Sequence, residues 1–292
     1  MHNGEWSLIS FTLLSQLSVG LVLALGFMYF MHQSLFAGFT TGLSLRSPEF
    51  IILVLIVIAT LLSLLHLGSP LHSYQSLNNL RGSWISREIL MLSMFGFGML
   101  LFMLSRYFDW SVGISQIFII FSMLSGILLI LAMTGIYMIP TVPSWDNFYT
   151  PVSFIGSVFL LGSIGMMVFM MLSGNVEMNH KFLYQIIIFM IIVVAVLIIT
   201  GGFHQYHLSQ IKFTGIEQTK FNQGLFLVIF IIRIILLFVI AVSLFYLNQI
   251  IFNHDRNFSM IQKLFILVSF LILLEEVIGR YLFYGSYFRV GV

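Results

Sequence analysis

The sequence predicts an all-α polytopic membrane protein, a bundle of eight transmembrane helices joined by short loops. Of its 292 residues, 60% are hydrophobic and only 8% are charged, whereas soluble domains average about 25% charged residues. The hydrophobic residues form long continuous runs, each near the roughly 20 residues that cross a bilayer. Because lipid cannot satisfy unpaired backbone groups, continuous runs require helices and exclude a barrel. The expected spans are residues 8–31, 50–67, 88–105, 112–138, 151–173, 182–201, 224–248 and 261–284.

The whole chain, residues 1–292, is expected to form a single integral membrane anchor domain. The first run is not a cleavable signal, because the residues before it contain Glu5 and no Lys or Arg, and the run is too long. An even number of spans places both termini on one side of the membrane, here named face A, opposite face B. Basic residues outside the spans divide evenly between the two faces, so they do not indicate which face is cytoplasmic. The net charge of +2 is thinly spread and gives no sign of nucleic-acid binding.

A histidine stands where the second span ends. The run from Ile51 to Leu65 is followed by His66-Leu67-Gly68-Ser69-Pro70, and Ser86-Arg87-Glu88 opens the third span. Since one span leaves the membrane and the next re-enters it, His66 and Glu88 must share face A. A titratable imidazole and a carboxylate near the hydrocarbon edge can exchange protons with a lipid-soluble substrate. The alternative is structural: His66 complements a helix C-terminus, and Glu88 an N-terminus with Ser86 as its N-cap.

The loop between the fourth and fifth spans is rich in proline and aromatic residues. Pro140 and Pro143 end the fourth span, and Thr150-Pro151 is typical of an N-cap followed by proline at the first helical position. Between them, Trp145, Phe148 and Tyr149 suit the membrane interface. The loop is either an aromatic anchor or a docking surface for a partner.

Four charged residues are expected well inside the last two spans, away from their face B ends. Arg233 is expected about 14 Å below face A, Glu276 about 12 Å and Arg280 about 6 Å, at the helical rise per residue. Glu275 has a depth similar to that of Glu276 but points about 100° away. An isolated charge at such depth is costly, so we expect Arg233 to pair with one of the two glutamates. Glu276 and Arg280 can pair along one helix face.

These charges have two interpretations. They either form a structural ion cluster that fixes the packing of the last two spans or line a functional polar pocket. His204 and His207, at the face A end of the sixth span, lack obvious partners for a metal site, so we expect no metal there. The chain has no cysteine, which excludes cysteine-bound iron–sulfur clusters. Gly20/Ala24 and Ser122/Gly126 are most simply close helix contacts.

Three segments resemble a known family. LLHLGSP with the following SLNNLRGSWISREI, then TVPSWDNFYTP, and finally EEVIGRYLFYG are similar to the membrane-anchor subunit of dimethyl sulfoxide reductase, the DmsC family. The resemblance covers almost the whole chain, with the motifs in the same order. It implies a subunit of the bacterial cytoplasmic (inner) membrane that holds an iron–sulfur subunit and a molybdopterin catalytic subunit. It also implies that menaquinol is bound transiently and oxidised, with electrons passing to the iron–sulfur subunit and no haem or cluster in this chain.

Carried over by motif, His66 and Glu88 are the expected catalytic residues of the quinol site. Its expected binding set is His66, Ser69, Glu88, Glu276 and Arg280. The family pattern gives a small residue at the position of Glu275, so the resemblance assigns Glu275 no role. Two other functions compete. A transporter predicts charges that reach both faces; a passive anchor or assembly factor predicts that no cavity adjoins His66.

Overall fold

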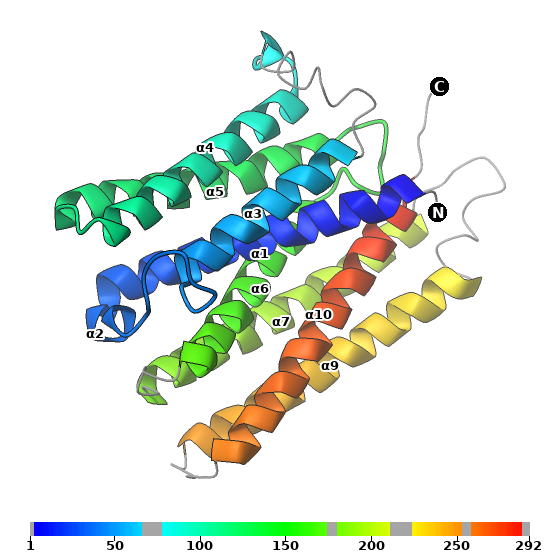
Figure 1. The fold of residues 1–292 in the computed structure, drawn as a ribbon. Helices are drawn as coiled ribbons and strands as arrows, with labels where there is room; N and C mark the ends of the chain where they lie inside the picture. Colours follow the sequence, from blue (N-terminus) through cyan, green and yellow to red (C-terminus); the bar gives the residue numbers. More distant parts are fainter. Residues whose placement is uncertain (1–2, 66–77, 174–179, 211–223, 253–257, 288–292) are drawn as a thin grey trace. The chain divides into compact units, whose positions relative to one another are not determined.

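The protein is all-α in a computed structural model that describes residues 3–65, 78–173, 180–210, 224–252 and 258–287. Its helices are α1 (Asn3–Met31), α2 (Gln33–Ala37), α3 (Pro48–Leu65), α4 (Trp84–Tyr107), α5 (Val112–Tyr137), α6 (Tyr149–Ser173), α7 (His180–Gln210), α9 (Gly224–Phe252) and α10 (Phe258–Gly285) (Figure 1). Among the described residues, six helices are long and apolar enough to cross a membrane: α1, α4, α5, α6, α7 and α9. These six helices confirm the polytopic α-helical class. Helix α3 is a shorter apolar helix, and α10 contains four charged residues.

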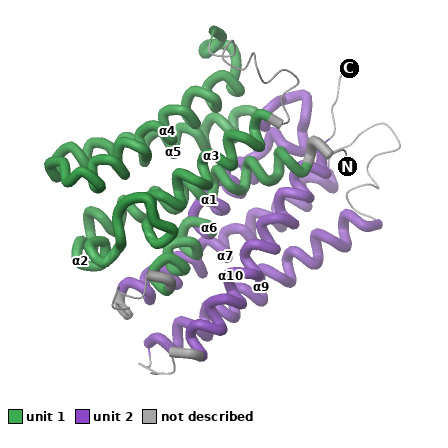
Figure 2. Tube along the Cα trace, in the orientation of Figure 1, with its two compact units in different colours: residues 1–136, 161–179 green, residues 137–160, 180–292 purple. Residues whose placement is uncertain are grey.

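The chain divides into two compact units (Figure 2). Unit 1 comprises residues 1–136 and 161–179, which hold α1 to α5 and the second half of α6. Unit 2 comprises residues 137–160 and 180–292, which hold the first half of α6 with α7, α9 and α10.

In unit 1, α3 packs against both α1 and α4 (Figure 1). The second half of α6 approaches α1 so closely that a Cβ atom on Gly162 would lie 2.4 Å from the backbone carbon of Gly20. Only glycine allows two helix backbones to come this near, as in other membrane helix pairs. The sequence prediction of a close helix contact at Gly20 is therefore confirmed.

In unit 2, α9 packs against α7 on one side and α10 on the other. The outer face of α9 carries Val228, Ile235 and Val242, which are 51%, 57% and 67% exposed. Their seven-residue spacing forms one apolar stripe along the helix. A wholly apolar exposed stripe of this length is suited to contact with lipid rather than water.

Two helices begin at different residues from those predicted. Helix α4 starts at Trp84, and its N-cap is Ser83, whose hydroxyl accepts a hydrogen bond from the Ser86 amide at 3.3 Å. The predicted N-cap, Ser86, was wrong, because the capping residue lies within the polar loop before the apolar run. Glu88 therefore lies four residues inside α4 and does not open it.

Helix α6 starts at Tyr149, where the side-chain oxygen of Asn147 accepts a hydrogen bond from the Tyr149 amide at 2.9 Å. The Thr150 hydroxyl bonds back to the Trp145 carbonyl oxygen, so Thr150 is helical rather than the predicted N-cap. Pro151 falls in the first turn, where its missing N–H removes no intrahelical bond. Helix α7 continues to Gln210, so His204 and His207 lie on a helix.

Candidate functional site

Four charged side chains are buried together inside unit 2. Arg233 of α9 is 7% exposed, and Glu275, Glu276 and Arg280 of α10 are 0%, 3% and 3% exposed. Their formal charges sum to zero, which is the composition expected where isolated charges would be costly. We refer to these four residues and their hydrogen-bond partners Tyr149, Ser153 and Ser157 as the unit 2 polar cluster.

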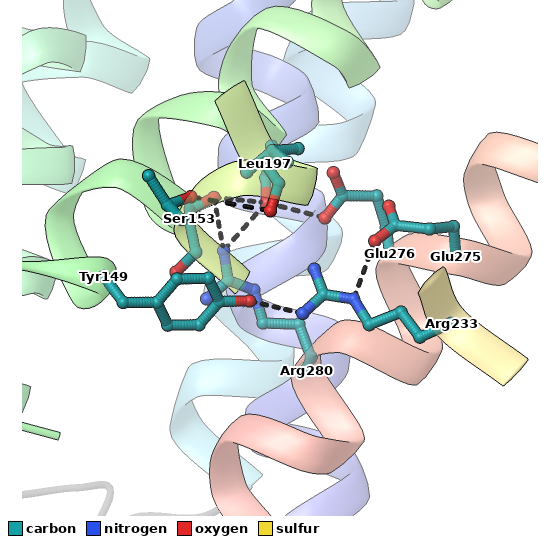
Figure 3. Close-up of polar contacts among 9 residues, drawn as sticks. Tyr149, Ser153, Leu197, Arg233, Glu275, Glu276 and Arg280 are labelled. Atoms are coloured by element: carbon teal, nitrogen blue, oxygen red, sulfur yellow. Dashed lines mark hydrogen bonds and ion pairs between the residues drawn. The ribbon is translucent and has the colours of Figure 1, made fainter. Parts of the chain in front are cut away.

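One arm of the cluster is centred on Arg233. Its Nε donates to Oε1 of Glu275 at 2.8 Å, and its Nη1 donates to the Tyr149 hydroxyl. Figure 3 shows the guanidinium lying between the tyrosine and the glutamate. The prediction that Arg233 pairs with a glutamate of the last span is confirmed, and the partner is Glu275. The tyrosine ring is in turn stacked on His204, with centroids 4.3 Å apart and planes 14° apart.

A glycine makes room for this arm. A Cβ atom on Gly279 of α10 would lie 2.8 Å from one guanidinium nitrogen of Arg233 and 2.9 Å from its Cζ. Since Gly279 lies four residues after Glu275, the two residues present one face of α10 to Arg233. Gly279 of α10 thus leaves space for the guanidinium, and Glu275 of the same helix provides the carboxylate that pairs with it.

The other arm is centred on Ser157 of α6. Its hydroxyl lies 2.6 Å from Oε2 of Glu276 and accepts from Nη2 of Arg280 at 2.9 Å. The same hydroxyl lies 2.8 Å from the Ser153 carbonyl oxygen, which also lies 3.5 Å from Nη2 of Arg280. The sequence predicted that Glu276 and Arg280 could pair along α10. The structure joins them through a serine of another helix.

Aromatic rings surround Arg280 and bring two sequence motifs together. The Arg280 Cζ lies 3.8 Å from the centroid of the Phe154 ring, a cation–π arrangement. Trp145 stacks on Phe283 at 5.3 Å and 13°, and its indole nitrogen donates to the Phe283 carbonyl oxygen at 2.8 Å. The TVPSWDNFYTP and EEVIGRYLFYG segments therefore pack on each other within unit 2.

The aromatic residues of the loop before α6 have different environments. Tyr149 is 7% exposed within the polar cluster, and the half-buried Trp145 stacks on Phe283. Phe148 alone of the three is largely exposed, at 75%. Tyr149 is thus turned inward, while the aromatic anchor and the docking surface stay two predictions for the rest of the loop.

A small cavity of about 20 Å³ adjoins the cluster, lined in part by Tyr149, His204, Arg233 and Gly279. This volume accommodates about one water molecule and is too small for a quinol ring. The Nδ1 of His204 is buried without a hydrogen-bond partner in the described structure. Oε2 of Glu275 is also buried and unpartnered within the same described residues.

The histidines of α7 have separate environments. His204 stacks on Tyr149, while Nε2 of His207 lies 3.3 Å from the carbonyl oxygen of Pro143. Within the described ranges, no group of three or more His, Asp or Glu side chains could hold a metal ion.

The predicted quinol-site residues that the structure describes belong to both units. Glu88 belongs to α4 of unit 1, and Glu276 and Arg280 belong to α10 of unit 2. His66 and Ser69 lie outside the described residues. Of the set, the structure brings Glu276 and Arg280 together, through Ser157.

Unit 1 has a charged pair that the sequence reasoning missed. Nη1 of Arg106, in the last turn of α4, lies 2.5 Å from Oε1 of Glu49, in the first turn of α3. Glu49 is 1% exposed and also accepts a hydrogen bond from the Ser47 hydroxyl at 2.7 Å. The Arg106 Cζ lies 4.1 Å above the Phe36 ring. Unit 1 therefore holds a partly buried ion pair between the ends of α3 and α4.

The sequence reasoning also missed Ser153 and Ser157. Their spacing of four residues on an apolar helix places two hydroxyls on one face, which is the available signal for a polar helix contact. That signal does not identify the partner, because serines at such spacing commonly bond only to their own helix backbone.

Comparison with known proteins identifies the family. The model of the family described as DMSO reductase anchor subunit (DmsC) matches residues 1–286. The chain belongs to this family. It is 29% identical over 295 residues to anaerobic dimethyl sulfoxide reductase chain YnfH of Escherichia coli (strain K12), covering 100% of this chain and 99% of that protein.

Two further relatives carry similar descriptions. The anaerobic dimethyl sulfoxide reductase C subunit of Haemophilus influenzae is 26% identical over 292 residues, covering 99% of this chain and 96% of that protein. The C subunit of the Escherichia coli (strain K12) enzyme is 30% identical over 245 residues, covering 82% and 80%. The resemblance noted in the sequence motifs is thus confirmed, and this DmsC-family chain is a multi-pass membrane protein.

Proposed function

We propose that this chain anchors an anaerobic dimethyl sulfoxide (S-/N-oxide) reductase complex in the bacterial inner membrane and oxidises menaquinol there. The observation that carries the proposal is the family match over residues 1–286, supported by two relatives described as anaerobic dimethyl sulfoxide reductase chains, which match over 99% and 96% of their own length. Eight spans, formed by α1, α3 to α7, α9 and α10, place both termini on face A. An iron–sulfur subunit docks on that face and passes electrons to a molybdopterin catalytic subunit.

In this mechanism menaquinol binds near face A with His66, Ser69, Glu88, Glu276 and Arg280 as its binding set. His66 accepts a hydrogen bond from one quinol hydroxyl and takes its proton, because imidazole titrates near neutral pH. Glu88 receives or relays protons to the water of face A. Oxidation releases two protons and two electrons and leaves menaquinone, and the electrons pass to the iron–sulfur subunit.

Arg280 and Glu276 stabilise each other within unit 2. The arginine offsets the charge of the glutamate, and both bond to the Ser157 hydroxyl. The two charged groups can therefore remain buried at a modest free-energy cost, because each is opposed by the other and is hydrogen-bonded.

The test is His66→Phe in the complete complex in native membranes, with His32→Phe as the matched control in unit 1. We expect quinol-dependent reductase activity to fall at least about 100-fold in the first variant, the usual contribution of a general base. Reduction of the acceptor by an artificial dye that bypasses quinol should be unchanged in both. Full quinol activity in His66→Phe would overturn the site assignment. A membrane-bound wild-type complex that never oxidises quinol would favour the passive anchor.

A further inference from the structure

Unit 1 contains a groove that the proposed mechanism leaves unused. It has a volume of about 490 Å³ and lies between α3 and α4, reaching Leu43 in the loop before α3. Every lining residue is an apolar side chain or glycine. Ile56 and Met103 form its floor at 5% and 6% exposure, and Val57 and Phe97 flank it at 56% and 59%.

A glycine sets the depth of this groove. A Cβ atom on Gly96 of α4 would lie 3.2 Å from Cγ2 of Ile56 on α3, so the two helices are already in tight contact there. Because Gly96 has no side chain, the floor of the groove is recessed relative to the exposed side chains of Val57 and Phe97 that flank it. The groove is therefore a recess of defined shape rather than a flat lipid-facing surface.

The groove and Glu88, a residue of the proposed head-group site, are both on α4. Gly96 lies eight residues after Glu88 on α4, about 12 Å along the helix, and Met103 lies about 22 Å along it. A hydrocarbon tail attached to a ring near Glu88 and running across the bilayer beside α4 passes through this interval. Menaquinol has such a tail, a polyisoprenoid.

We propose that the groove between α3 and α4 binds the polyisoprenoid tail of menaquinol. The inference rests on the proposed quinol oxidation and specifies how the substrate is held. Lipid tails are as apolar as the polyisoprenoid, so binding of the tail in the groove is stabilised by packing contacts rather than by the hydrophobic effect. It contributes to binding only for a quinol whose tail reaches it.

The test compares a long-tailed menaquinol with menadiol, which has the same ring system and no tail, in membranes containing the complete complex. Val57→Trp fills the groove from its exposed side. Leu124→Trp is the matched control, because Leu124 of α5 is 57% exposed and lies outside the groove. We expect Val57→Trp to raise the KM for the long-tailed quinol about fivefold, through lost packing contacts, with the menadiol KM unchanged. The control should change neither KM.

Equal effects on both quinols, or no effect on either, would overturn the inference and leave the groove to a bilayer lipid. If the unaltered complex oxidises neither quinol, the proposed function itself fails. A direct measurement uses a long-tailed quinone with a photoreactive group on its tail. We expect labelling of residues 50–58 and 96–103, reduced by excess menaquinol and absent in Val57→Trp. Labelling that excess menaquinol does not reduce would also overturn the inference.

Discussion

In unit 1 the buried Glu49 lies in the first turn of α3 and pairs with Arg106 in the last turn of α4, whereas in unit 2 Arg233 and Glu275 pair between the interiors of α9 and α10. In the unit 1 pair, Arg106 is 15% exposed and Glu49 also accepts from Ser47, close to the ends of both helices. The unit 2 pair lies inside α9 and α10, away from the ends of those two helices, and is completed by Tyr149, the first residue of α6, and by the space at Gly279. A pair that needs such support is costly to keep, which is the usual mark of a functional intramembrane group.

The largest expected effect comes from breaking the unit 2 pair. Glu275→Leu leaves Arg233 charged and buried without its carboxylate, which should destabilise the protein by about 3–5 kcal/mol. The measurement is the melting temperature of the detergent-solubilised complex, together with the amount of subunit retained in membranes. A melting temperature equal to that of the wild type would show that the pair contributes little.

Removing both partners separates the structural from the functional interpretation. Arg233→Met combined with Glu275→Leu replaces the pair by apolar side chains of similar size, which is often neutral or stabilising. We expect the melting temperature to recover. If the pair is only structural, quinol-dependent activity recovers with it; if it serves the site, activity stays low in a stable protein.

The second largest effect concerns the serine that joins Glu276 and Arg280. Ser157→Ala removes a hydroxyl that bonds to both charged groups, which should cost about 1.5–3 kcal/mol. Ser93→Ala is the control, since the exposed Ser93 hydroxyl bonds to its own helix, at the Ile89 carbonyl oxygen. Indistinguishable melting temperatures for the two variants would argue against Ser157 as the link.

A smaller effect is expected from filling the space beside Arg233. Gly279→Ala places a methyl group 2.8 Å from the guanidinium, and the arginine must shift, at about 1–3 kcal/mol. Gly285→Ala on the same helix has open space around its Cβ position and should be neutral. A loss of thermal stability in the second variant but not the first would contradict this account of α10.

The smallest effect should come from the unit 1 pair. Arg106→Gln replaces a partly exposed cation at a helix end by an amide that can still donate to Glu49, and Ser47 also still donates to it. We expect a loss of about 1 kcal/mol, the typical net contribution of one hydrogen bond, because the carboxylate keeps its other donor. A loss as large as that of Glu275→Leu would remove the contrast between the two units.

The sequence predicted the helices better than their first residues. Apolar runs place α5 at Val112–Tyr137 and α10 at Phe258–Gly285, close to the predicted ranges, because burial in lipid requires those residue types. The starts of α4 and α6 were misplaced, because Ser83 and Asn147 cap their helices from polar loops that hydrophobicity does not resolve.

The sequence by itself determined that this protein crosses the membrane as helices, that Arg233 needs a carboxylate, and which family it belongs to. The composition, the order of the motifs and the presence of a charge within an apolar run can all be read from the sequence, and lipid gives the first and the last a known free-energy consequence. Only the tertiary structure decided that Glu275 rather than Glu276 meets Arg233, that Ser157 joins Glu276 to Arg280, and that Tyr149 turns inward. Adjacent residues on a helix point about 100° apart, so the rotation of α10 against α6 and α9 selects each partner.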